Sequence, residues 1–167
     1  MVIKQFSLTN TPLEPAQLWQ PLANLRAGAF VSFEGWVRNH NHGKIVTALE
    51  YEVYPALALK EGEQILAEAI GKFDLLGAIA SHRYGTLTLG EIAVWVGVTA
   101  PHRQQAFAGA AYIIDEIKHR LPIWKKEYYL NEPATWVYCR EHHHYGLFDD
   151  DGGQPWGLSR LASASDG

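Results

Sequence analysis

Residues 115–127 read Asp-Glu-Ile-Lys-His-Arg-Leu-Pro-Ile-Trp-Lys-Lys-Glu and join the end of a predicted helix to a cluster of basic side chains. The segment 103–121 has apolar residues at helical spacing, and Pro122 should end this helix because proline disfavours helical geometry in the residue before it. At about 100° per residue, Lys118 projects about 20° from Phe107, near the middle of the predicted apolar stripe. A lysine in such a stripe must extend to water or face a polar cavity, so this stretch suggests a pocket for an anion.

The bulk composition is that of one globular domain in a reducing compartment. The chain has 167 residues, enough for a single domain with a real core. Its 14 Lys and Arg residues against 18 Asp and Glu residues give a formal charge of -4, which argues against broad binding of nucleic acid or of an anionic membrane. The single cysteine, Cys139, excludes an internal disulfide and a cysteine-based zinc site. Because no apolar run resembles a signal peptide or a membrane span, we expect a cytoplasmic protein.

The predicted elements favour an α+β fold. Strand patterns cover residues 2–8, 29–38, 45–53, 75–83, 92–98 and 135–139, and Gly35 suggests a bulge. Helix patterns cover residues 15–25, 55–73 and 101–121. Few helices separate these strands and short glycine turns join them, which favours an α+β layer over a doubly wound sheet.

The composition changes near Gly146. We expect residues 1–145 to form one domain and residues 146–167 to be an acidic, Gly/Ser-rich tail that is mostly disordered, although Trp156 or Leu158 could dock on the core. The histidine run His142–His144 could bind a divalent metal weakly, but a solvated linker is the simpler interpretation.

Three basic stretches are candidates for binding an anion, and each also has a simpler interpretation. The turn 38–43, Arg-Asn-His-Asn-His-Gly, could present a guanidinium and imidazoles to an anion, or it could be a polar turn. The stretch 101–103, Pro-His-Arg, begins a helix, where backbone N–H groups and the helix dipole favour an anion, or its basic side chains could be solvated. The chain after Pro122 could fold Lys125 back towards Lys118, or both could be surface lysines.

Taken together, these segments resemble the catalytic (large) subunit of molybdopterin synthase from about Ala29 to Val137. The stretches that carry the resemblance by their order and spacing are Phe33–Asn41, Leu49–Pro55, His82–Gly85 with Gly90–Glu91, Val96–Arg103, Lys118–Glu127 and Trp136–Val137. Two features depart from the family pattern. Ile123 replaces the usual aromatic residue after the proline that ends the helix, which should affect packing, and the chain beyond about Glu141 has no counterpart.

The resemblance implies an α/β hammerhead fold with an additional antiparallel β subdomain, and a sulfurtransferase activity. Members of the family insert two sulfurs into cyclic pyranopterin monophosphate to make molybdopterin. The sulfur arrives as a thiocarboxylate on the C-terminal Gly-Gly tail of a small ubiquitin-like subunit. The implied assembly is a homodimer with one small subunit at each end, a heterotetramer, and the transfer itself requires no metal or organic cofactor.

The resemblance also implies roles for particular residues. Lys118 would act as general acid or base, or would stabilise the tetrahedral intermediate derived from the thioester, and Lys125 would hold phosphate or neutralise developing charge. Arg38, His102 and Arg103 match the family positions that hold the pterin and its phosphate. Arginine suits this role because its guanidinium can make bidentate contacts to phosphate. The remaining residues that match substrate-lining positions are Trp36, Val37, Lys126 and Glu127.

Two other functions remain open from the residues alone. A metal-dependent hydrolase could use His40, His42 and the His142–His144 run, and its activity would be sensitive to chelators. A non-catalytic adaptor could bind a ubiquitin-like tail through an exposed groove, and Lys118 would then matter little.

Overall fold

The computed structural model describes residues 1–137. Cys139, the His142–His144 run and the predicted tail 146–167 lie outside the described residues, as does the predicted domain boundary after residue 145. Within the described part, no helix is both long and apolar enough to cross a membrane.

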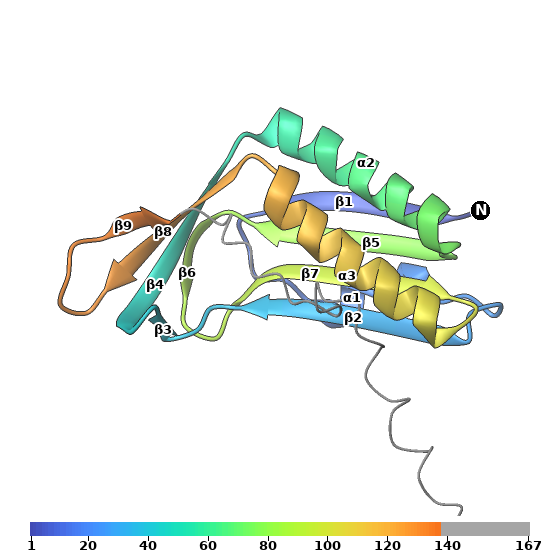
Figure 1. Cartoon of the computed structure of the whole chain (residues 1–167), viewed down its shortest axis with the longest axis horizontal. Helices are drawn as coiled ribbons and strands as arrows, with labels where there is room; N and C mark the ends of the chain where they lie inside the picture. Colours follow the sequence, from blue (N-terminus) through green and yellow to red (C-terminus); the bar gives the residue numbers. More distant parts are fainter. Residues whose placement is uncertain (138–167) are drawn as a thin grey trace, which may run out of the picture.

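The larger layer is a mixed sheet of four strands covered by two helices. Its order is β1 (Ile3–Thr9), β5 (Gly77–Arg83), β7 (Ile92–Ala100) and β2 (Ala29–Trp36). Strands β1 and β5 are parallel, and the other two pairings are antiparallel. The helices α2 (Pro55–Phe73) and α3 (Arg103–Arg120) lie side by side on one face of this sheet (Figure 1). This arrangement confirms the α+β class.

The two faces of this sheet have separate apolar cores. The face under α2 and α3 is lined by small and branched residues, among them Ala78 and Ala80 of β5 and Val96 of β7. The short helices α1 (Pro15–Leu18) and η1 (Gln20–Leu22) take the place of the longer helix predicted over 15–25. Leu22 packs with Ile79 and Trp95 in a smaller cluster.

The second layer is an antiparallel sheet that extends beyond the ends of the helices (Figure 1). Its strands are β3 (His40–Asn41), β4 (Lys44–Val53), β8 (Ile123–Tyr129) and β9 (Thr135–Val137), and β6 (Gly85–Thr88) also pairs with β4. Strand β3 forms a hairpin inside the predicted loop, with His42 and Gly43 at positive φ of 46° and 78°. The predicted bulge at Gly35 is confirmed, because the register of β2 against β7 shifts between Gly35 and Trp36.

Strand β8 was missed from the sequence, where this segment was read as a loop. Helix α3 ends at Arg120, and Leu121 is already extended at φ -69° and ψ 135°, as expected before Pro122. The chain then runs directly into β8, which pairs along β4 from Val53↔Ile123 to Val46↔Tyr129. The Lys-Lys-Glu sequence hides the strand because its two faces are both partly polar, so no apolar alternation is visible.

The buried face of α3 also differs from the predicted stripe. The middle of the predicted apolar stripe is not buried, because Phe107 is 63% exposed and Lys118 is exposed as well. The predicted stripe consists of Phe107, Ala111, Ile114, Lys118 and Leu121. The residues of α3 that are buried are Ala106, Gly109, Ala110, Ile113, Ile114 and Ile117. Small residues allow the helix to approach closely: a Cβ on Gly109 would lie 2.8 Å from a methyl carbon of Leu75. The true face is therefore rotated by about one residue, and Lys118 lies at its edge.

Candidate active site

A cavity of about 580 Å³ lies where the two sheets and the end of α3 meet. Lys118 contributes from the last turn of α3, Lys125 and Glu127 from β8, and Trp36 and Arg38 from the end of β2 and the turn after it. The structure therefore brings together residues that are up to 91 positions apart (36 to 127) in one chain. His40 and His42 of the β3 hairpin also line this cavity.

Glu127 is the buried acidic centre of the cavity. Its side chain is 2% exposed and accepts hydrogen bonds from Asn41 Nδ2 at 2.8 Å and Tyr129 Oη at 2.7 Å. Lys125 Nζ lies 3.1 Å from Glu127 Oε1. Burial by itself raises the pKa of Glu127, but the hydrogen bonds from Tyr129 and Lys125, with the Lys125 charge, outweigh burial and leave the pKa below its ordinary value. Glu127 is thus an ionised carboxylate that holds Lys125 in place.

Asn41 connects the hairpin turn to this carboxylate. Its amide nitrogen donates to Glu127, and its amide oxygen accepts a hydrogen bond of 2.9 Å from Arg38 Nη2. The turn 38–43 is therefore both a tight turn and part of the cavity wall, so the two interpretations of this stretch are compatible. No sequence pattern points to this role of Asn41, because its partner Glu127 lies 86 positions away.

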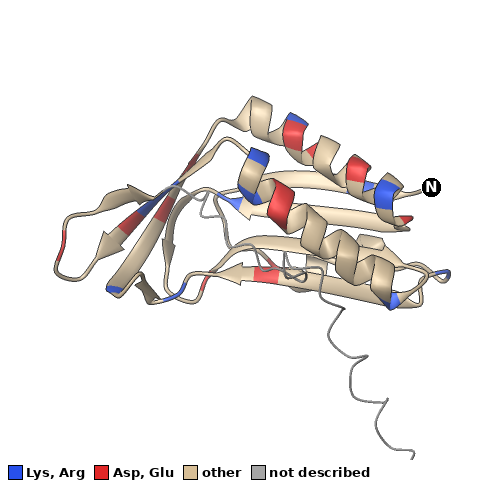
Figure 2. Cartoon of the chain, in the orientation of Figure 1, with Lys and Arg blue, Asp and Glu red and all other residues tan. Residues whose placement is uncertain are grey.

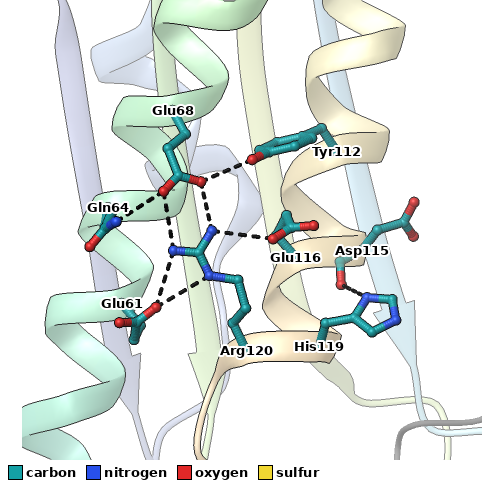
Figure 3. Close-up of polar contacts among 8 residues, drawn as sticks. All are labelled: Glu61, Gln64, Glu68, Tyr112, Asp115, Glu116, His119 and Arg120. Carbon is teal, nitrogen blue, oxygen red and sulfur yellow. Dashed lines mark hydrogen bonds and ion pairs between the residues drawn. The ribbon is translucent and has the colours of Figure 1, made fainter.

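The last turn of α3, which carries Lys118, is fastened to α2 by a charged network that we call the Arg120 brace (Figure 3). The Arg120 guanidinium donates to Glu68 Oε2 at 2.6 Å, to Glu61 Oε2 at 3.1 Å and to Glu116 Oε2 at 3.2 Å. Tyr112 Oη also donates to Glu68. The hydrogen bond from Arg120 is the largest cause that lowers the pKa of Glu68, to about 2. Arg120 therefore fixes the helix two residues beyond Lys118.

A buried histidine lines the same cavity as Lys118. His82 of β5 is 7% exposed and lines the cavity, and its ring stands edge-on to Tyr51 of β4 with 5.0 Å between centroids. Burial is the main cause that lowers the pKa of His82 to about 4, and the nearby charge of Lys118 lowers it further. The imidazole is therefore neutral near pH 7. No role of His82 is predicted from the sequence, although the residue lies in the stretch His82–Gly85 that carries the family resemblance.

His102 and Arg103 do not reach this cavity within one chain. Both are exposed at the first residues of α3, while Lys118 lies near its end. Lys118 lies fifteen positions after Arg103, which corresponds to about 22 Å of helix.

Val37 and Lys126 also lie outside the cavity lining. Val37 is 3% exposed and packs in the core of the second sheet, and its backbone N–H and C=O bond to Glu91 and Gly90. Lys126 projects from the opposite face of β8 to Lys125, with Nζ above the rings of Tyr128 at 5.3 Å and Trp136 at 5.5 Å. These two residues therefore flank the lining.

Charge is distributed over the molecule without a broad basic face in the view of Figure 2. Lysines, arginines and carboxylates are interspersed along α2 and α3 and over the region of β4 and β8. Among residues 1–137, no group of three or more His, Cys, Asp or Glu side chains is placed to hold a metal ion. Within the described residues, the cavity gathers the cationic side chains of Arg38, Lys118 and Lys125 and is a local basic site.

Comparison with known proteins identifies the family. The family model described as MoaE protein matches residues 8–120. The molybdopterin synthase catalytic subunits of Nostoc sp. and Bacillus subtilis are each 38% identical to this chain, over 79% and 81% of it and over 81% and 85% of their own lengths. The crystal structure of molybdopterin synthase from Staphylococcus aureus superimposes with a TM-score of 0.74 at 36% identity, covering 81% of this chain and 98% of that one. The chain belongs to the MoaE family, the catalytic subunits of molybdopterin synthase.

Proposed function

We propose that this protein is a sulfurtransferase of molybdenum cofactor biosynthesis that converts cyclic pyranopterin monophosphate to molybdopterin. The observation that carries the proposal is the single cavity in which a chain of this family gathers Arg38, Lys118 and Lys125. Three cationic side chains and one ionised carboxylate leave the cavity with an excess of positive charge. This charge suits a small anionic substrate such as a pterin phosphate. The molecule thus combines a family with a known reaction and a pocket whose charge fits the substrate.

The sulfur must come from a second protein. The chain has a single cysteine, which lies beyond the described residues, so two sulfurs per product cannot be drawn from its own side chains. We propose a small ubiquitin-like subunit that enters the cavity with a C-terminal thiocarboxylate. The thiocarboxylate sulfur displaces an oxygen from a side-chain carbon of the pterin, so that a C–S bond replaces a C–O bond and the oxygen leaves as water or stays on the phosphate as the ring opens. Water then attacks the thioester carbonyl, the bond between that carbonyl carbon and sulfur breaks, and the carrier leaves as a carboxylate while sulfur stays on the pterin. A second carrier repeats these steps.

The two lysines would have different roles in this reaction because their surroundings differ. Lys125 is ion-paired with Glu127, so it is held rigidly and its charge is partly compensated. Among residues 1–137, Lys118 makes no ion pair with a carboxylate, so its ammonium keeps its full charge for an oxyanion. We assign Lys118 to the tetrahedral intermediate or to proton transfer, and Lys125 with Arg38 to the phosphate or to the charge that develops as the ring opens. Trp36 would form the rim of the cavity.

His102 and Arg103 enter the proposal through a second copy of the chain. Since they lie about 22 Å along α3 from Lys118, they can complete the same site only if a homodimer brings the start of a partner's α3 to this cavity. Together with one carrier at each end, this gives the heterotetramer. Val37 and Lys126 flank the lining and would act by shaping β2 and β8.

Reconstitution tests the function. The purified protein is mixed with cyclic pyranopterin monophosphate and a thiocarboxylated small subunit, and the dithiolene is detected after oxidation to a fluorescent pterin. We expect product that depends on the thiocarboxylate, and none with the unmodified carrier. Carrier binding without product would favour the adaptor, and stoichiometric metal in the purified protein with a chelator-sensitive hydrolytic activity would favour the hydrolase. We expect the protein to act in the cytoplasm, where thiocarboxylate carriers and a reducing environment coincide.

A further inference from the structure

His82 is a polar residue on a face of β5 that is otherwise apolar. Ala78 and Ala80 share this face and pack against the helices α2 and α3 in the main core. Two residues further along, at the point where β5 leaves the helical cover, His82 opens onto the cavity. A side chain at this position could be apolar without disturbing the pattern, so the imidazole calls for a chemical reason.

The hydrogen bond of one ring nitrogen fixes the tautomer of His82. Nδ1 lies 2.7 Å from the carbonyl oxygen of Arg83, and because a carbonyl only accepts, Nδ1 carries the proton. Nε2 therefore presents a lone pair. The edge-on contact with Tyr51 holds the ring plane, and among residues 1–137 no donor to Nε2 is recorded. A neutral acceptor on a rigid strand thus belongs to the lining of the cavity that Lys118 also lines.

The two lysines of the cavity consequently face different groups. Lys125 is paired with the carboxylate of Glu127, whereas Lys118 lines the cavity together with the imidazole of His82 and its charge acts on that imidazole. Lys118 is long, flexible and at the exposed edge of α3, so without an acceptor inside the cavity its ammonium would extend to water. A neutral acceptor can draw the ammonium inward and leave its charge uncompensated, which a carboxylate cannot do.

We propose that His82 is a positioning residue for Lys118: its Nε2 accepts a hydrogen bond from the Lys118 ammonium and holds that charge inside the cavity. Only the expected effect of this contact on catalysis rests on the proposed function. In this structure Lys118 is exposed and none of residues 1–137 donates to Nε2, so the contact forms when the flexible Lys118 side chain turns into the cavity, and it requires no substrate.

Nuclear magnetic resonance tests the contact without any activity measurement. In protein labelled with ¹⁵N at histidine, long-range ¹H–¹⁵N spectra should show His82 as the Nδ1–H tautomer, with an Nε2 resonance shifted by an accepted hydrogen bond. Lys118→Met should move this resonance towards the position of an unbonded nitrogen, and the matched change Lys125→Met should leave it in place. An Nε2–H tautomer, or an Nε2 resonance that ignores Lys118→Met, overturns the proposal.

Kinetics then test whether Lys118 acts through this contact. His82→Leu should lower kcat about tenfold or more with little change in KM, because a hydrogen bond to a charged group is lost. His82→Gln, which can place an amide oxygen near the Nε2 position, should restore part of kcat. In a Lys118→Ala background, His82→Leu should cost no further activity.

Two further results separate this proposal from a structural role and from the proposed function. Ser81→Ala, on the opposite face of β5 where Ser81 bonds to Ser7 at 2.9 Å, should leave kcat within about twofold. An equal loss from His82→Leu in both the wild-type and Lys118→Ala backgrounds overturns the positioning role. If wild-type protein forms no dithiolene at all, the proposed function fails, while the spectra still decide whether His82 holds Lys118.

Discussion

Glu127 sets the charge and the position of one of the two cavity lysines. It is almost completely buried and accepts from Asn41, Tyr129 and Lys125. Glu127→Gln removes the charge and places an amide donor against groups that themselves donate. We expect the free energy of unfolding to fall by about 1–3 kcal/mol and kcat to fall about tenfold, because Lys125 is no longer held. Chemical denaturation and single-turnover rates measure the two effects.

Glu132 offers the matched control for this prediction. It pairs with Lys44 at 2.7 Å, but both side chains are more than two fifths exposed, at 49% and 42%. Glu132→Gln should change stability by less than about 0.5 kcal/mol and leave kcat unaltered. Equal effects of the two substitutions would show that the burial of Glu127 contributes nothing to its role.

His82 gives the protein a predictable sensitivity to acid. Its pKa is lowered from 6.5 to about 4 in the folded state, mainly by burial. The unfolded chain therefore binds a proton as the pH falls below about 6.5, while the folded chain does so only near pH 4, so stability is lost across this interval as the pH falls. The loss from this residue alone should approach about 3 kcal/mol. His82→Gln should flatten the pH dependence of the unfolding free energy between pH 6.5 and pH 4, and an unchanged slope would contradict the assignment.

At the scale of elements, the Arg120 brace connects the end of α3 to α2. Arg120→Met keeps the aliphatic stem but leaves Glu61, Glu68 and Glu116 close together without their cation. We expect the free energy of unfolding at pH 7 to fall by about 1–2 kcal/mol, since the network is partly exposed. The matched change Lys60→Met on the exposed side of α2 should have little effect, and thermal denaturation compares the two.

The same brace predicts a second acid-sensitive interval. The pKa of Glu68 is about 2 when folded against an ordinary value of 4.5, chiefly because of the hydrogen bond from Arg120. The stabilisation from this carboxylate is therefore complete above about pH 4.5 and is lost as the pH falls towards 2. In Arg120→Met this dependence should largely disappear. A variant that retains it would show that Tyr112 and Gln64, rather than Arg120, hold the pKa down.

Elements differed in how far the sequence could predict them. Helix α2 was predicted with its bounds, because Pro55 marks its start and its apolar residues have a clear helical period. Strand β8 was missed because its inward residues Lys125 and Glu127 are charged and find their partners only in the folded cavity. The face of α3 was misplaced because a large exposed Phe107 outweighed the small residues that actually pack. A helix face that packs through alanine and glycine is hard to recognise from the sequence, because these small residues contribute little to the pattern of large apolar side chains.

At the scale of the whole molecule, the cavity could be predicted only in part. Lys118, Lys125 and Arg38 are candidates for an anion pocket from the basic stretches of the sequence, the resemblance gives them roles, and the structure places all three on one cavity. Asn41 and His82 were not assigned, since their roles depend on contacts between distant strands. The distance of Arg103 from Lys118 could be predicted, because both lie on the helix expected over residues 101–121, but the sequence does not show which copy of the chain supplies Arg103 to a given cavity.

A mixed dimer tests whether two copies share each site. Arg103→Ala and Lys118→Ala each remove one component, and both homodimers should be inactive. If Arg103 of one copy serves the cavity of the other, a mixed dimer contains one intact site and one doubly altered site. Random mixing of equal amounts should then restore about a quarter of the wild-type activity. No recovery, with mixed dimers shown to form by mass spectrometry, would mean that Arg103 does not act across the interface.

The most direct measurement is the yield of dithiolene from cyclic pyranopterin monophosphate and a thiocarboxylated carrier, with wild-type protein and with Lys118→Ala side by side. Lys60→Ala provides the control for loss of one lysine, and carrier binding and melting temperature confirm that each variant is intact. We predict product from wild-type and Lys60→Ala, and a loss of at least about a hundredfold for Lys118→Ala. Near-normal turnover by folded Lys118→Ala would contradict the placement of the chemistry in this cavity.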